Sequence, residues 1–227
     1  MERASARGYG FHVEQGTATT LNDLLADALS ALALPGERAE PLARLAELVA
    51  RWADRLNLTG HHGADTIARR LVADAIALGA ALGDALPASV ADLGSGAGFP
   101  GLPLAIVWPA AQLTLVDSRE RRHHFQRTAI RTLGLRNATA LRGRAEQIPP
   151  VESQVVLAQA MAKPNVALEW MRRWAAPGGL LVLPQSEGFT EPECPAGIER
   201  LAVRRYVVPL GGPTRAIWIG RRTAADG

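Results

Sequence analysis

The spacing of apolar residues changes once along the chain. Apolar positions recur at helical intervals over residues 21–34, 41–56 and 65–82, which predicts three helices. From residue 89 onward, short β-branched runs alternate with helical segments, which is typical of a mostly parallel sheet with crossover helices. The expected strands are residues 89–93, 112–117, 138–142, 154–159, 179–184, 201–208 and 214–220.

The predicted fold is therefore an α/β, doubly wound, Rossmann-like sheet of seven strands with an N-terminal helical extension. The last two strands lack a long helix between them, so we expect an antiparallel pair with Gly211 and Gly212 in its turn. The expected divisions are a loose tail at residues 1–19, the helical extension at 20–84 and a cofactor-binding domain at 85–227.

A glycine-rich segment, VADLGSGAGFPG, follows the first apolar run of that domain. Glycines at Gly94, Gly96 and Gly98 allow the backbone to press against a bound nucleoside cofactor at the start of a helix. The segment also fits the dinucleotide pattern G-x-G-x-x-G, which is weak by itself. Asp92 separates the readings, because its carboxylate repels a pyrophosphate but suits the ammonium and sulfonium charges of S-adenosylmethionine (SAM). A glycine-rich turn without a ligand is the alternative.

A second acid supports a nucleoside site. Asp117 ends the expected strand QLTLVD, about 20 residues after the glycines, where doubly wound sheets place the acid that binds the cofactor ribose. Asp117 also stands where it could cap the following helix, and the two roles are compatible.

Composition narrows the class of protein. The 227 residues, 48% of them apolar, suffice for one sizeable core. Cys194 is the only cysteine, so we expect no disulfide within the chain, no multi-cysteine metal site and a reducing, cytoplasmic location. The longest apolar stretch, residues 75–82, is too short to span a membrane, and residues 1–16 lack a secretory signal core. The histidines at 61–62 and 123–124 are adjacent pairs rather than i, i+4 pairs on a helix, so the two members of each pair point apart and no metal site is expected.

Positive charge is concentrated on one predicted helix. The formal net charge is +3 with a pI near 9.7, and every basic residue except Lys163 is an arginine. A basic cluster lies beside the expected ribose acid and consists of Arg119, Arg121, Arg122, His123, His124, Arg127 and Arg131. The cluster predicts an electropositive rim for an anionic partner, with a solvated helix face as the alternative.

Four ordered blocks together carry a specific resemblance. They read RWADRLNLTG (51–60), GSGAGFPGLPLAI (94–106), VDSRERR (116–122) and GRAE (143–146), and the match spans roughly residues 42–220. The chain resembles the glucose-inhibited division protein B family, bacterial enzymes that methylate guanine N7 in small-subunit ribosomal RNA. This resemblance implies the methyltransferase variant of the doubly wound sheet.

The resemblance also implies site residues. SAM is expected at Gly94, Phe99, Ala145 and Glu146, with the N-terminal helices and the basic rim facing ribosomal RNA or the small subunit. Asn57 matches the family's N-L-T segment, and three arginines match its basic positions, so the expected substrate-binding residues, with Arg144 added as a further phosphate contact, are Asn57, Arg121, Arg122, Arg144 and Arg215. We expect the protein to act as a monomer.

Three positions depart from the family pattern. Gln159 occupies a cofactor- and substrate-lining position where the family carries an arginine, Gln185 replaces a lysine, and Leu71 replaces a histidine. Charge-assisted hydrogen bonds are about twice as strong as neutral ones, so their loss indicates either an altered substrate or compensation by nearby arginines.

The sequence indicates methyl transfer without a general base. Guanine N7 offers a lone pair and carries no proton, so positioning alone suffices and no catalytic residue is assigned. Amino-group methylation is disfavoured, because Pro149 and Pro150 are flanked by Ile148 and Val151 rather than by the N/D-P-P-aromatic residues. Cytosine C5 chemistry is disfavoured because Cys194 lies in a proline-rich loop. Two alternatives stay open, a SAM methyltransferase for a small molecule and a non-catalytic RNA-binding module of the same fold.

Overall fold

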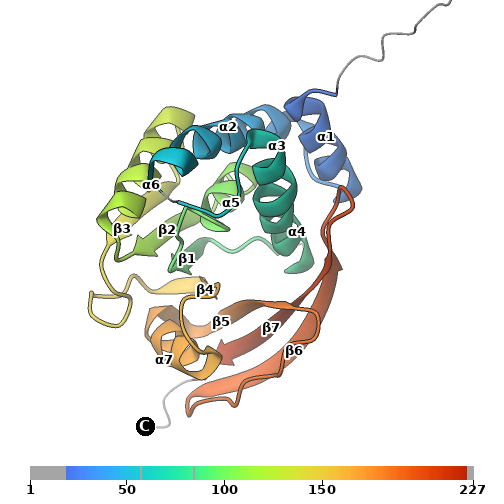
Figure 1. The fold of residues 1–227 in the computed structure, drawn as a ribbon. Helices are drawn as coiled ribbons and strands as arrows, with labels where there is room; N and C mark the ends of the chain where they lie inside the picture. Colours follow the sequence, from blue (N-terminus) through green and yellow to red (C-terminus); the bar gives the residue numbers. More distant parts are fainter. Residues whose placement is uncertain (1–18, 57, 84, 224–227) are drawn as a thin grey trace, which may run out of the picture.

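The central feature of the fold is a seven-stranded sheet. The computed structural model describes residues 19–56, 58–83 and 85–223 (Figure 1). The strand order is β3-β2-β1-β4-β5-β7-β6, and β7 runs antiparallel to both of its neighbours while the other pairs are parallel. The strands are β1 (Ser89–Leu93), β2 (Gln112–Asp117), β3 (Ala138–Arg142), β4 (Ser153–Ala158), β5 (Ala175–Ser186), β6 (Ile198–Val207) and β7 (Thr214–Arg222). The predicted doubly wound sheet with an antiparallel end is confirmed.

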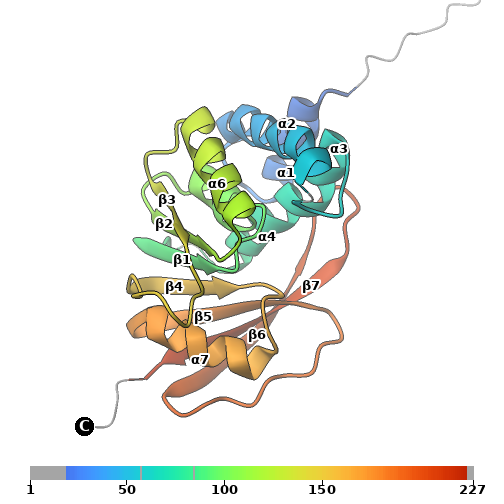
Figure 2. The ribbon, with the colours of Figure 1, turned by 60° about the vertical axis from the view of Figure 1, so that its left-hand side comes forward.

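Helices cover the two faces of the sheet unequally. Figures 1 and 2 show the N-terminal helices together with α5 and α6 on one face, and α7 alone on the other. None of the described helices is both long and apolar enough to cross a membrane. The helices are α1 (Leu21–Ala31), η1 (Gly36–Arg38), α2 (Ala39–Leu56), α3 (Ala64–Ile67), η2 (Ala68–Val72), α4 (Ala73–Ala81), α5 (Gly101–Val107), α6 (Glu120–Leu133) and α7 (Pro164–Trp174).

Several element boundaries differ from the sequence-based expectation; β5, for example, spans Ala175–Ser186 rather than residues 179–184. The first helix ends at Ala31 rather than at residue 34, since Ala33 has a left-handed backbone with φ 53°. The third helix forms as α3, η2 and α4 in direct succession, with η2 a π-helical turn that the apolar spacing did not reveal. Strand β4 ends at Ala158, so Gln159 follows the strand rather than closing it.

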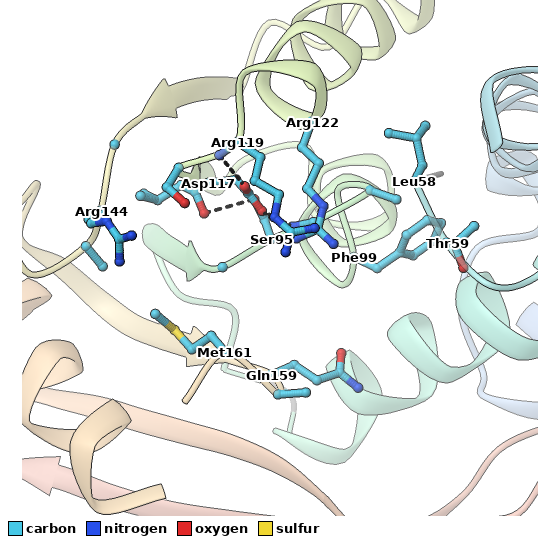
Figure 3. A pocket seen from close by; sticks show the side chains of 18 of the residues that line it. Leu58, Thr59, Ser95, Phe99, Asp117, Arg119, Arg122, Arg144, Gln159 and Met161 are labelled. Atoms are coloured by element: carbon cyan, nitrogen blue, oxygen red, sulfur yellow. Dashed lines mark hydrogen bonds and ion pairs between the residues drawn. The ribbon is translucent and has the colours of Figure 1, made fainter. Parts of the chain in front are cut away.

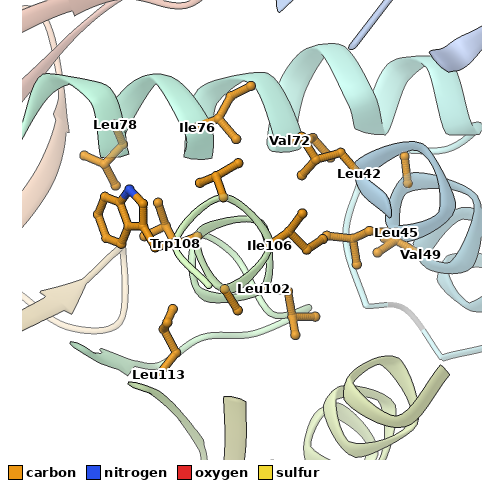
Figure 4. Close-up of a cluster of buried hydrophobic side chains, with 14 of the residues drawn as sticks. Leu42, Leu45, Val49, Val72, Ile76, Leu78, Leu102, Ile106, Trp108 and Leu113 are labelled. Atoms are coloured by element: carbon orange, nitrogen blue, oxygen red, sulfur yellow. The ribbon is translucent and has the colours of Figure 1, made fainter. Parts of the chain in front are cut away.

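The N-terminal helices and the sheet share one hydrophobic core. Leu42 and Leu45 of α2 and Ile76 of α4 are fully buried and pack with α5 and with Leu113 of β2 (Figure 4). Burial of apolar surface at about 25 cal/mol per Å² makes this shared core the main force that fixes the helices over the sheet. As a result, the segment between α2 and α3 is held above the carboxyl ends of the strands.

The opposite face is organised around α7. Trp174 is fully buried there, and its Nε1–H donates to the carbonyl of Ala145 at 2.9 Å. Leu168 and Met171 of the same helix pack against the sheet. This hydrogen bond fixes the backbone of the loop that follows β3.

Asn137 fixes the loop that joins α5 to β2. Its Nδ2 group lies within 3.0–3.1 Å of the carbonyl oxygens of Ala105, Trp108 and Ala111, and the residue is nearly buried. Ala105 lies in the last turn of α5, Trp108 is its C-cap and Ala111 directly precedes β2, so one side-chain amide holds both ends of this connection.

We predict that Asn137→Ala lowers the free energy of unfolding by about 2–3 kcal/mol, because buried carbonyls lose their donor. Chemical denaturation monitored by circular dichroism measures the change. Asn165→Ala, at an exposed position on α7, is the control and should change stability by less than about 0.5 kcal/mol. Equal stability of the two variants would contradict the role assigned to Asn137.

Candidate functional site

A cavity of about 620 Å³ opens at the carboxyl ends of β1 to β4, where ligands bind in doubly wound sheets. The turns after β1, β2, β3 and β4 contribute to its wall, as do Leu58 and Thr59 from the segment before α3 (Figure 3). Its volume lies in the range usual for small-molecule sites. The cavity is therefore the candidate cofactor site.

The glycine turn after β1 forms one side of this cavity. Gly94 and Gly96 line it, both with left-handed backbones (φ 70° and 57°) that favour glycine. A Cβ on Gly94 would lie 2.7 Å from Cβ of Met161, so a side chain has no room there. Gly98 is not part of the lining, and a Cβ on it would lie 2.3 Å from Cδ1 of Leu102. Gly98 thus serves close packing against α5.

Asp117 lies at the centre of the polar wall. Its side chain is 4% exposed and lines the cavity. Oδ2 accepts from the backbone N–H of Gly96 at 3.0 Å, and Oδ1 accepts from that of Arg119 at 2.8 Å. The N-cap residue of α6 is Arg119, so Asp117 braces the turn before the helix instead of occupying the cap position.

The sequence analysis assigns Asp92 to the charges of SAM and thus expects it at the mouth of the site, and this expected position is wrong. Its side chain is 1% exposed, is not part of the cavity lining, and lies beneath the turn, where Oδ2 accepts from the N–H of Gly101 at 2.8 Å. Among the described residues, Oδ1 has no hydrogen-bond partner. Burial raises the pKa of Asp92 to about 7, opposed by the Gly101 hydrogen bond and reinforced by the charge of Asp117.

Gln126 is a site residue that the sequence analysis missed. It is fully buried on α6, and its Nε2 donates to Oγ of Ser95 and to the carbonyl of Gly96, both at 2.8 Å. These bonds tie α6 to the glycine turn. A glutamine within a run of basic residues gives no signal of such a contact, because the partner lies 30 residues away.

The loop after β3 supplies the next part of the wall. Ala145 and Glu146 both line the cavity, as expected, and Ala145 is 4% exposed. The carbonyl of Glu146 accepts from the Arg173 guanidinium, and its carboxylate lies 3.7 Å from Nη1 of Arg144. Phe99 and Gln159 also line the cavity.

The arginines predicted to bind substrate occupy three different settings. Arg121 is exposed on α6 outside the cavity wall, while Arg144 lines the cavity and is largely exposed. Arg122 and Arg215 are each paired with a buried or half-buried acid, and their role in substrate binding stays a prediction. Nη1 of Arg122 lies 3.3 Å from Oδ2 of Asp117, and Nε of Arg215 lies 3.3 Å from an oxygen of Asp74.

Asn57, also predicted to bind substrate, lies outside the described residues. Its neighbours Leu58 and Thr59 line the cavity.

The residues present fit SAM. The cavity offers a carboxylate among backbone N–H groups and a glycine turn without side chains. Beneath that turn, outside the lining, lies a buried acid oxygen that has no partner among the described residues. A carboxylate beside the turn suits ribose hydroxyls, and a negative charge beneath it suits a cationic cofactor. Sheet and site together define a SAM-dependent methyltransferase.

Comparison with known proteins identifies the family. The model of the GidB family, described as rRNA small subunit methyltransferase G, matches residues 38–192. The chain belongs to this family, which confirms the resemblance found in the sequence.

Curated relatives extend the match. The chain is 33% identical over 202 residues to ribosomal RNA small subunit methyltransferase G of Stenotrophomonas maltophilia, covering 83% of this chain and 94% of that protein. It is 35% identical over 164 residues to the protein of that name from Cereibacter sphaeroides, covering 70% and 79%. Among solved structures, a mutant of MtNAS in complex with S-adenosylmethionine shares the fold, with a TM-score of 0.56 at 16% identity over 82% of this chain and 72% of that one.

The raised pKa of Asp92 predicts a pH-dependent stability. The folded protein binds the Asp92 proton more tightly than the unfolded chain, so this group lowers stability as pH rises from about 4 to about 7. Asp92→Asn should raise the free energy of unfolding at pH 8 by roughly 2–4 kcal/mol, with a smaller gain at pH 5. Urea denaturation at both pH values tests this, with Asp27→Asn on the surface of α1 as the control. A gain that is equal at both pH values would contradict the assignment.

We predict that Gln126→Leu weakens SAM binding about tenfold or more, because the glycine turn loses two hydrogen bonds that hold it in shape. Titration calorimetry with SAM measures the affinity. Gln112→Leu, at an exposed position at the opposite end of β2, is the matched control. Wild-type affinity in Gln126→Leu would show that the turn keeps its shape without α6.

Proposed function

We propose that this protein transfers the methyl group of SAM to N7 of a guanine in small-subunit ribosomal RNA. The observation that carries the proposal is the family match over residues 38–192, which covers the described parts of the cavity wall from Leu58 to Trp170. Its curated relatives bear the name ribosomal RNA small subunit methyltransferase.

The proposed cofactor contacts follow the cavity wall. Asp117 would accept hydrogen bonds from the ribose hydroxyls, and these hydroxyls would displace the Arg122 guanidinium from Oδ2. The backbone at Ala145 and Glu146 would contact the adenine. Gly94 and Gly96 would lie against the cofactor backbone, and Asp92 would act from beneath as a buried negative charge. Gly98 would contribute through the packing of the turn.

The proposed reaction needs no acid or base from the side chains. Bound SAM would supply a methyl group on a cationic sulfur; the bond between that carbon and N7 would form as the carbon–sulfur bond breaks, and sulfur would keep the electron pair. Because N7 carries no proton, the protein needs no general base and contributes by alignment. Phe99 and Leu58 would exclude water, and the exposed Arg121 and Arg144 would hold RNA phosphates.

A small-molecule substrate is the second candidate. The three positions that depart from the family pattern line cavities at one end of the site. They are Leu71, Gln159 and Gln185, which replace polar or basic residues of the family. Fewer cations at that end suit an acceptor with fewer phosphates.

We predict that Gln159→Arg increases methyl transfer to RNA, because it adds a cation where the cofactor cavity adjoins a second, smaller cavity beyond β4. Transfer of radiolabelled methyl from SAM to small subunits that lack the modification measures the rate, which should fall steeply as salt rises. Gln112→Arg, at the far end of β2, adds the same charge as a control. Label that enters only a small-molecule extract, at a salt-insensitive rate, would favour the second candidate.

A further inference from the structure

A second cavity of about 290 Å³ adjoins the cofactor cavity. The two share Gln159, Ala160 and Met161, the residues that follow β4, and Ala160 has a left-handed backbone with φ 50°. A non-glycine residue in this conformation is strained, and such strain is concentrated at functional sites. The second cavity extends over the ends of β5 and β7 to Asp74 at the start of α4.

The order of the strands shows which end of a bound cofactor would point toward this cavity. The proposed adenosine contacts lie at the ends of β2 and β3, whereas the second cavity lies beyond β4 on the other side of β1. A cofactor whose adenosine occupies the β2–β3 side therefore directs its other end toward β4. The methyl acceptor belongs in the second cavity.

The second cavity contains a carboxylate held by two partners. The Tyr206 hydroxyl donates to Oδ1 of Asp74 at 2.7 Å, and Nε of Arg215 lies 3.3 Å from Oδ2. Burial and the charge of Asp74 raise the pKa of Tyr206, so the hydroxyl stays protonated and continues to donate. The π-helical turn η2 comes directly before Asp74, and such turns are frequent at functional sites.

This arrangement leaves capacity for a ligand. Each carboxylate oxygen can accept two hydrogen bonds, so one site on each oxygen remains after Tyr206 and Arg215. Among the described residues, Nε of Arg215 has no acceptor in hydrogen-bond geometry. A ligand that offers two adjacent donors and a neighbouring acceptor complements the cavity.

Among the four RNA bases, guanine alone has that pattern. Its N1–H and N2–H₂ groups are adjacent donors and O6 is the neighbouring acceptor, while the other bases place an acceptor beside each donor. When these groups face a protein, N7 lies on the opposite side of the ring. A guanine held in this way presents N7 toward the cofactor cavity.

We propose that the Asp74–Tyr206–Arg215 cluster is the guanine-recognition subsite, in which the Asp74 carboxylate accepts from N1–H and N2–H₂ of the acceptor base. This inference rests on the proposed function and names its specificity determinant. Methylation of N7 leaves a positive charge on the guanine ring, so the Asp74 carboxylate also stabilises the charge that develops during transfer. Tyr206 acts as a positioning residue, since it orients Asp74.

Nucleotide binding tests the subsite without methyl transfer. The protein is saturated with S-adenosylhomocysteine, and the affinities of guanosine and inosine monophosphate are measured by NMR titration. Inosine lacks only the N2 amino group, so wild type should bind the guanosine nucleotide about tenfold more tightly. Asp74→Asn should abolish this preference while the affinity for S-adenosylhomocysteine stays unchanged.

Two further variants keep the test decisive. Asp65→Asn removes a carboxylate that is paired with Arg69 outside both cavities and should keep the preference for guanine. Tyr206→Phe keeps the ring but frees Asp74, and should reduce the preference even where Asp74→Asn fails to fold. Equal affinities for the two nucleotides in wild type, no detectable binding at millimolar concentration, or a preference retained in both Asp74→Asn and Tyr206→Phe would overturn the proposal.

Failure of the subsite and failure of the proposed function give different results. Methyl transfer to small subunits without any guanine preference overturns the subsite alone. A guanine preference that depends on Asp74, without transfer to small subunits, supports the subsite and indicates another guanine-containing acceptor.

Discussion

The turn after β1 is the structural constraint on which the site depends. The N–H groups of Gly94 and Ser95 donate to the carbonyl of Val116 at 2.8 and 3.0 Å, and that of Gly96 donates to Asp117. Gln126 then fixes the turn from the side of α6. One wall of the cavity, the start of α5 and the position of Asp117 all follow from this short segment, because each is bonded to it or begins where it ends.

Asp92 shows that this arrangement costs stability. A carboxylate that is 1% exposed, with one oxygen unpartnered among the described residues, disfavours the folded state when ionised. In the proposed function, the same negative charge favours a cationic cofactor above the turn. Stability given up for binding is a common compromise at functional sites. The buried acid and the glycine turn would thus act together on the cofactor. The acid would provide a negative charge, and the turn, which has no side chains, would let the cofactor approach the backbone.

Local patterns predicted the sheet, its antiparallel end and the glycine turn, because strands and tight turns leave periodic or glycine-rich signals in the sequence. The acid at the end of β2 was placed correctly in the cavity wall by its distance from the glycines. Such patterns could not predict contacts between side chains that are far apart in the sequence. Nothing near Arg215 indicates that it meets Asp74, 141 positions earlier in the chain, or that Tyr206 joins them. The sequence also did not predict the contacts of Gln126 or the π-helical turn η2, because both depend on packing rather than on local sequence.

The central claim is that this protein aligns a guanine N7 with SAM and that the transfer needs no general base. Identification of the methylated nucleoside tests it most directly. Small subunits that lack the modification are incubated with the protein and SAM, their RNA is digested, and the nucleosides are separated by liquid chromatography and mass spectrometry. The account predicts 7-methylguanosine as the new product. A methyl group on an exocyclic amine, on a ribose hydroxyl or on another base would contradict it.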